Sequence, residues 1–174
     1  MLRITELRKS FGSLVAVDGV SLSVARGEVF GLLGPNGAGK STTIGMAIGL
    51  LAPDSGSVEL EGFGSPRDPA ARRQIGVAQQ SLALYDELSG EENLLFFGRI
   101  QGLSGSLLNT RVNTVLEQVG LADRRRDRVA GYSGGMKRRL NLAAAIVHDP
   151  PLLLLDEPTA GVDPQSRNSI LDLV

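Results

Sequence analysis

The stretch "GPNGAGKST", residues 34–42, constrains the fold of this chain more than any other segment. It matches the pattern G-x-x-x-x-G-K-[ST] and stands between an expected strand and an expected helix. Glycines let successive backbone amides turn towards an anion, and the helix that follows directs the positive end of its dipole at the same point. Lys40 offers a charge to the β and γ phosphates of a nucleotide, and Ser41 offers a hydroxyl to Mg²⁺. The alternative is a plain surface glycine loop. The predicted phosphate-binding residues are Gly34, Pro35, Asn36, Gly37, Ala38, Gly39, Lys40, Ser41 and Thr42.

Apolar patterning predicts an α/β fold around this loop. The run "PLLLLDE" (151–157) is the strongest strand signal, because four consecutive leucines suit a strand buried on both faces of a parallel sheet that helices cover. The other expected strands cover 20–24, 28–34, 57–63 and 74–79, and the expected helices cover 41–51, 91–101, 107–119 and 136–147.

The composition excludes several classes of protein. The chain has 174 residues, a net charge of −1 and no cysteine, so it has no disulfides or thiolate metal sites. No apolar run approaches the length of about 20 residues that a membrane span needs. Trp is absent and aromatic residues are few, so we expect no nucleic-acid partner. We expect a cytoplasmic chain whose membrane role depends on a partner.

Two acids follow the leucine run. Asp156 stands at the carboxyl end of the expected strand, where open α/β sheets bind ligands, and can hold the Mg²⁺ shell through water. Glu157 comes next, and the turn expected at Pro158 would bring its carboxylate towards the phosphates, where it could orient or activate water. The alternative is a pair of solvated acids at a strand end.

The stretch "GYSGGMKRRL" (131–140) combines features that disfavour a helix start. Ser133 is a good N-cap, but two glycines in the first turn weaken the helix by about 1 kcal/mol each. The three basic residues 137–139 then add positive charge where the helix dipole is already positive. Both features suit a helix start that faces an anion. The alternative is a flexible turn with a solvated basic face.

Taken together and in this order, "GPNGAGKST", "YSGGM" and "LLLLDEPTAGVD" resemble the ATP-binding cassette family. The resemblance covers nearly the whole chain. It implies a P-loop NTPase fold with a parallel-sheet core, an N-terminal antiparallel β part and a helical subdomain. The expected domain is a single one, residues 1–174, with an ATP-binding core over 1–85 and 151–174 and a helical subdomain over 86–150.

The resemblance assigns further residues. Phe11, in "KSFG", stands where the family stacks an aromatic ring on adenine, although an ordinary Phe at the edge of the core is the alternative. In the Gln loop, which senses Mg²⁺ and contacts the membrane partner, the match falls on Gln80 of the Gln79-Gln80 doublet. Asp163, in "AGVD", is expected to reach across a dimer interface. The residues expected to cover the γ-phosphate held by the partner subunit are Ser133, Gly134 and Gly135.

Three departures from the family pattern stand out. Tyr132 replaces Leu, and Met136 replaces a Gln whose hydrogen bonds it cannot make. The family's γ-phosphate His would follow the last motif, whereas the only His, His148, precedes Asp156 and takes no catalytic role by this resemblance. The sequence therefore resembles a C-terminally incomplete subunit, with a low expected ATPase activity by itself.

The resemblance implies a function. We expect an ATP- and Mg²⁺-dependent ATPase subunit on the inner face of the cell membrane, paired head to tail with a second nucleotide-binding domain and bound to a transmembrane permease. The drug-resistance and ABC-2 export branch is the most similar. The alternatives are a clamp or translation ATPase and a non-hydrolysing nucleotide-binding module. The interval between Lys40 and Ser133 contains no heptad run, unlike the clamp types. The cargo depends on the permease.

Overall fold

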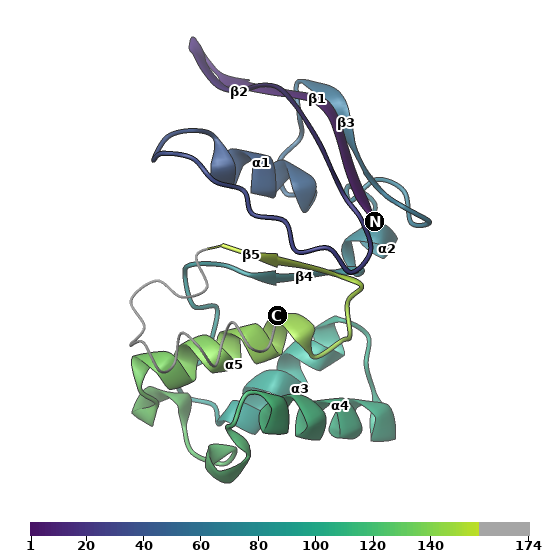
Figure 1. Ribbon diagram of the computed structural model, residues 1–174. Coiled ribbons are helices and arrows are strands. Elements are labelled where there is room, and N and C mark those ends of the chain that lie inside the picture. Colours follow the sequence, from purple (N-terminus) through teal and green to yellow (C-terminus); the bar gives the residue numbers. More distant parts are fainter. Residues whose placement is uncertain (157–174) are drawn as a thin grey trace. The chain divides into compact units, whose positions relative to one another are not determined.

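The structure is a computed structural model that describes residues 1–156. The chain divides into two compact units, and the division falls between Ile75 and Gly76. Each unit has its own secondary structure, shown along the chain in Figure 1. The phosphate-loop segment belongs to the first unit, and the segment that carries Ser133 and Asp156 belongs to the second.

An antiparallel sheet organises the first unit. Strands β1 (Leu2–Phe11), β2 (Leu14–Val24) and β3 (Ser55–Leu60) lie in the order β2-β1-β3. The sheet confirms the expected N-terminal antiparallel β part. Its alternating strands bury Leu7 and Leu60 completely, as the period of two predicts. Helices α1 (Lys40–Ala47) and α2 (Pro69–Arg72) belong to the same unit.

The prediction of a strand over residues 28–34 is wrong. The segment has no regular secondary structure and pairs with none of β1, β2 and β3. Its apolar side chains are exposed, with Val29 at 79% and Leu33 at 92%. An apolar run indicates only that a segment suits burial on both faces. A strand forms where a neighbouring strand offers its hydrogen-bonding edge, and in the described first unit none pairs with this run.

The second unit joins a small sheet to a group of helices. Strands β4 (Ile75–Ala78) and β5 (Leu152–Leu155) pair, and their arrows point the same way in Figure 1. All four helices expected from the sequence are present within one or two residues at their starts, although α1 ends earlier than expected. The elements between β4 and β5 are α3 (Gly90–Ile100), α4 (Gly105–Gln118), the 3₁₀ turns η1 (Ala122–Arg124) and η2 (Val129–Gly131), and α5 (Gly134–Ile146).

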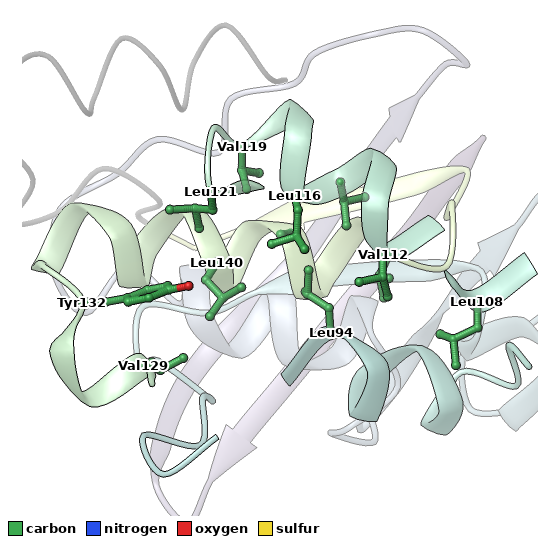
Figure 2. Close-up of a cluster of buried hydrophobic side chains, with 12 residues drawn as sticks. Leu94, Leu108, Val112, Leu116, Val119, Leu121, Val129, Tyr132 and Leu140 are labelled. Atoms are coloured by element: carbon green, nitrogen blue, oxygen red, sulfur yellow. The ribbon is translucent and has the colours of Figure 1, made fainter. Parts of the chain in front are cut away.

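These helices share a hydrophobic core, which Figure 2 shows. The side chains of Leu94 from α3, Leu116 from α4 and Leu140 from α5 are fully buried there. Along α4 the buried residues recur at helical spacing, so one face of this helix is apolar. Truncating one of these leucines to Ala would destabilise the unit by about 2–5 kcal/mol. The core thus fixes the helix α5, whose N-cap is Ser133.

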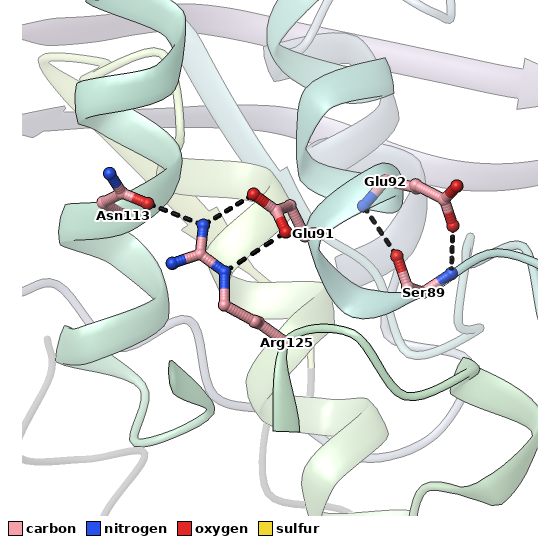
Figure 3. Close-up of polar contacts among 5 residues, drawn as sticks. All are labelled: Ser89, Glu91, Glu92, Asn113 and Arg125. Carbon is pink, nitrogen blue, oxygen red and sulfur yellow. Dashed lines mark hydrogen bonds and ion pairs between the residues drawn. The ribbon is translucent and has the colours of Figure 1, made fainter. Parts of the chain in front are cut away.

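Polar contacts fix the start of α3, as Figure 3 shows. The Ser89 hydroxyl accepts from the Glu92 amide at 3.2 Å, and the Glu92 carboxylate accepts from the Ser89 amide at 2.8 Å, which is a complete capping box. Arg125 joins α3 to α4, because its guanidinium donates to the carboxylate of Glu91 and to the side-chain oxygen of Asn113. The assignment of residues 86–150 as a helical subdomain of a single domain stays a prediction.

Candidate functional site

The phosphate loop ends at a helix start that no side chain caps. Helix α1 begins at Lys40, and its N-cap Gly39 has φ 81° and ψ 7°. Gly37 also lies in the left-handed region, with φ 82°. Only glycine adopts this conformation readily, so the two glycines are required by the backbone. The first amides of α1 therefore have no side-chain acceptor, which is the arrangement that binds a phosphate.

Lys40 bends back over the loop. Its Nζ donates to the carbonyl oxygens of Gly34 at 2.7 Å and Pro35 at 2.9 Å. The ammonium is thus held above the loop, where oxygens of a phosphate can replace or join these carbonyls as acceptors. Ser41 is exposed at the first turn of α1, so its hydroxyl is accessible to a ligand. The loop geometry agrees with a phosphate site.

The β1–β2 hairpin lies against the end of this loop. A side chain at Gly39 would collide with the carbonyl oxygen of Ala16 and come within 3.1 Å of Val17 Cγ2, both on β2. Phe11 ends β1, pairs with Leu14 across a short turn, and is 49% exposed. This exposure leaves the Phe11 ring accessible, and its adenine-stacking role stays a prediction. The hairpin therefore brings an exposed aromatic ring to the neighbourhood of the loop.

In the second unit, the ends of β4 and β5 meet. The backbone amide of Asp156 donates to the carbonyl oxygen of Ala78 at 2.9 Å. This bond brings Asp156 to the point where the chain leaves β4 into Gln79 and Gln80, whose side chains are both exposed. Carboxylate and amide oxygens suit Mg²⁺. Of the three predicted Mg²⁺ ligands, Asp156 and Gln80 thus belong to neighbouring strand ends of the second unit, and Ser41 lies in the first unit.

The start of α5 differs from that of α1. Ser133 is the N-cap in an extended conformation, and its hydroxyl accepts from the Met136 amide at 3.2 Å. This confirms the predicted cap. Gly134 is exposed, and a side chain added there would meet no atom within 4 Å. Packing within the described chain therefore does not require a glycine at this position.

The three basic residues of α5 bind within the second unit. Lys137 Nζ lies 2.8 Å from Asp86 Oδ1, Arg138 donates to the carbonyl oxygen of Gln80, and Arg139 donates to that of Val119 at 2.8 Å. Their place at the helix start predicted an external anion as the partner of these charges. The structure instead shows that two of the three tie α5 to the segment that contains Gln80.

Two buried asparagines hold the same segment. Asn141, on α5, accepts from the Ala83 amide at 3.4 Å and donates to the Gln79 carbonyl oxygen at 3.3 Å. Asn93, on α3, binds both backbone groups of Tyr85, at 2.9 and 3.0 Å. Neither asparagine was among the residues predicted from the sequence. The available signal was an Asn between or before apolar residues on a helix, in "LNL" and "ENLL".

Tyr132 and Met136, the two replacements in the stretch 131–140, both contribute side chains to the interior. Tyr132 is buried among the apolar residues of Figure 2, and its hydroxyl donates to the carbonyl oxygen of Arg124 at 2.8 Å. Burial, followed by the charge of Asp127, raises the pKa of this hydroxyl above its ordinary value. Met136 packs against the same cluster. Both side chains therefore contribute to the core of the second unit. The thioether of Met136 cannot make the hydrogen bonds that a Gln side chain makes.

The remaining predicted residues lie outside the described chain or away from the site. Glu157 and Asp163 fall outside residues 1–156. His148 lies in the turn after α5. A cavity of about 520 Å³ in the second unit is lined by Glu91, Asn113 and Arg125 among others. Because these groups already bind one another, the cavity belongs to the scaffold of the helices.

Comparison with known proteins identifies the class. The sequence profile of the family described as ABC transporter matches residues 17–160. The match includes the phosphate loop, the α5 start and the β5 acid. The chain therefore belongs to the ABC transporter family, as the three motifs implied. Within residues 1–156, none of the helices is both long enough and apolar enough to cross a membrane.

Curated relatives carry the comparison further. The chain is 49% identical, over its full length, to the linearmycin resistance ATP-binding protein of Bacillus subtilis, of which it covers 56%. It is 48% identical, over 98% of its length, to the doxorubicin resistance ATP-binding protein of Mycobacterium tuberculosis, of which it covers 53%. A Nod factor export ATP-binding protein of Paraburkholderia xenovorans is 47% identical. The chain thus spans about half the length of these relatives.

Solved structures agree on the fold. An ATP-binding subunit of an ABC transporter is similar with a TM-score of 0.87 at 33% identity, over 99% of this chain and 72% of that one. An ATP-binding cassette in its ADP conformation gives a TM-score of 0.88 at 29% identity, over 99% and 74%. These similarities confirm the predicted α/β P-loop NTPase fold.

Proposed function

We propose that this chain is the ATP-binding and ATP-hydrolysing subunit of a membrane ABC transporter that exports drugs or other hydrophobic compounds. The observation that carries the proposal is the uncapped start of α1 behind the left-handed Gly39, with the Lys40 ammonium held over the loop. Resistance and export in the names of the relatives support the direction of transport.

Each residue has a role in this proposal. The loop 34–42 holds the phosphates, and Phe11 stacks on the base. Ser41, Gln80 and Asp156 hold Mg²⁺, for which their oxygens are suited. ATP supplies the phosphoanhydride bond whose hydrolysis drives transport. The Glu157 carboxylate orients the attacking water and accepts its proton.

A second subunit completes the site. Ser133, Gly134, Gly135 and Asp163 of one subunit act on the nucleotide of the other, in a head-to-tail dimer. The open space at Gly134 supports this assignment, because it leaves room for a partner's phosphate. The segment around Gln80 contacts the permease, which places the subunit at the inner face of the membrane. The permease selects the cargo.

Paired substitutions test the catalytic roles. In the complete subunit with its permease, Glu157→Gln is expected to leave ATP affinity nearly unchanged and to reduce turnover by about 10²–10⁴, as for a lost general base. Asp156→Asn should instead weaken Mg²⁺-dependent binding. Equal binding defects in both variants, measured by calorimetry and phosphate release, would show that the two acids do not have separate roles.

A mixing experiment tests the composite site. Gly135→Asp should keep the ATP affinity of each chain and abolish ATP-driven dimerisation, because an added carboxylate repels the γ-phosphate. Mixing it with Lys40→Ala subunits creates heterodimers that contain one composite site with both halves intact. Chromatography should then recover dimers with one nucleotide. If Gly135→Asp lowers ATP binding in the isolated chain, the stretch serves its own nucleotide instead.

A further inference from the structure

The end of β1 is fixed by a carboxylate from a distant turn. Asp54 precedes β3, and its Oδ2 accepts from the Ser10 amide at 2.7 Å. Its own amide donates to the Arg8 carbonyl oxygen at 2.9 Å. The pairing of β1 with β3 ends at Arg8 and Ser55, so the Asp54 side chain takes over as acceptor where the ladder of backbone bonds stops. The backbone just before Phe11 is thereby held on the β3 side.

The same carboxylate holds a cation over the Phe11 ring. Lys9 Nζ lies 2.7 Å from Asp54 Oδ1 and 5.7 Å from the centroid of the Phe11 ring. The Lys9 side chain is only 15% exposed, so it is an ordered part of the surface. An ammonium within about 6 Å of a ring is attracted to its π face. One face of the ring is thus engaged by Lys9, while the ring remains half exposed.

This arrangement is connected to the phosphate loop. Lys9 pairs with Val17 across the hairpin, and Val17 is one of the two β2 residues that approach Gly39. Phe11 and Lys9 therefore belong to the paired strands β1 and β2, and the last glycine of the loop lies against β2 of the same hairpin. A nucleotide whose phosphates lie on the loop would find its base near this hairpin.

We propose that Lys9 and Asp54 are positioning residues for the base of a purine nucleoside triphosphate: they hold the Phe11 ring as a stacking platform. The proposal rests on the proposed nucleotide binding. Asp54 fixes the ammonium and the Ser10 backbone, and Lys9 occupies one face of the ring and leaves the other for the base. Because they act through Phe11, the two residues affect recognition of the base and not that of the phosphates.

The ratio of two affinities measures this role. Calorimetry with the full chain would compare Mg-ATP with Mg-triphosphate, the inorganic ion without a base. Phe11→Ala should weaken ATP binding by roughly fivefold to a hundredfold and leave triphosphate binding unchanged. Lys9→Met should reduce the ATP-to-triphosphate ratio by about two- to fivefold, and Asp54→Asn should change it in the same direction. The ratio cancels any uniform effect of changing the charge.

Two variants provide matched controls. Arg8→Met removes a positive charge one residue away from Lys9, and Asp18→Asn removes a carboxylate that pairs with Arg8. Both should leave the ratio unchanged. Thermal unfolding of each variant checks that the sheet remains folded. In the Phe11→Ala background, Lys9→Met should have no further effect on the ratio, because its route to the base has been removed.

The outcomes separate this proposal from the proposed function. If the full chain binds neither ATP nor triphosphate, the proposed function fails, and this inference with it. If Lys40-dependent binding is present but Lys9→Met and Asp54→Asn leave the ratio as it is, only this inference is wrong. Equal effects of Lys9→Met with and without Phe11 would also overturn it, because the residue would then act by charge alone.

Discussion

Two glycine-containing helix starts, α1 behind the phosphate loop and α5 behind Ser133, solve the same problem differently. In α1 the N-cap is a left-handed glycine without a side chain, and the basic Lys40 reaches back over the loop. In α5 the cap is a serine whose hydroxyl already satisfies the Met136 amide. The start of α1 is therefore prepared to hold an anion by itself, whereas the start of α5 is partly satisfied.

The charges differ in the same way. Within residues 1–156, Lys40 Nζ donates to carbonyl oxygens of its own loop, which a phosphate can replace. Lys137 pairs with the Asp86 carboxylate, and its neighbours Arg138 and Arg139 bind backbone carbonyls. A carboxylate thus neutralises Lys137, whereas Arg138 and Arg139 keep their positive charges although their donors are partly used. The start of α5 is therefore less prepared than that of α1 to hold a phosphate by itself, and the proposed composite site between two subunits makes no such demand on it.

Exchanging a glycine for alanine gives the largest expected difference. Gly39→Ala forces a left-handed residue, at about 1–2 kcal/mol, and its Cβ would collide with the carbonyl oxygen of Ala16. We expect ATP affinity to fall by more than about a hundredfold, as at least 3 kcal/mol of loop distortion would produce. Calorimetry measures it. Gly134→Ala, in open space, is the matched control and should bind ATP normally. Equal losses in both variants would contradict the comparison.

The two basic residues should differ next. Lys40→Ala removes a charge-assisted contact and should weaken Mg-ATP binding by roughly ten- to a hundredfold. Lys137→Ala removes the same charge from α5 and should leave the affinity of the isolated chain within about twofold, because its partner is Asp86. Fluorescence titration with an ATP analogue compares the two. An equal loss in both variants would show that α5 binds the chain's own nucleotide.

Capping should separate stability from binding. Ser133→Ala removes the acceptor for the Met136 amide and should destabilise α5 by about 1 kcal/mol without changing ATP affinity. Gly134→Ala should stabilise the same helix by up to about 1 kcal/mol. Chemical denaturation of the second unit, followed by circular dichroism, measures both. The idea of a partly satisfied start fails if Ser133→Ala leaves stability unchanged.

The smallest expected effect concerns acid stability. Hydrogen bonds from the Ser89 amide and hydroxyl lower the pKa of Glu92 below 4.5, and the bonds of Asp54 to Lys9 and Ser10 lower its pKa below 3.8. A lowered folded-state pKa stabilises the fold above the unfolded value, and this stabilisation is lost as pH falls through the folded value. Below pH 4.5, the free energy of unfolding of the second unit should depend less on pH in Glu92→Gln than in the unsubstituted chain. Below pH 3.8, the same should hold for the first unit in Asp54→Asn. Unfolding curves between pH 2 and 6 test this, and the two variants should not be interchangeable.

Local signals in the sequence predicted much of the fold. The phosphate loop, the Ser133 cap and the helix faces of the second unit follow from residues a few positions apart, so their pattern is visible without any tertiary contact. The strand expected at 28–34 is the instructive error. Its apolar run indicates that the segment is suited to burial. Whether it forms a strand depends on a hydrogen-bonding edge supplied by residues far away in the chain.

What the sequence alone determined is therefore the chemistry of the loop and its neighbours, including the family to which they belong. Only the tertiary structure decided the partners. Lys137 and Asp86 are 51 residues apart, and Lys9 and Asp54 are 45 apart. Neither pair has a fixed spacing that a sequence pattern could show. The interior positions of Tyr132 and Met136 were decided in the same way, because packing selects which face of a helix start is covered. Spacing along the chain determines local geometry, and proximity in space determines which charges remain for a ligand.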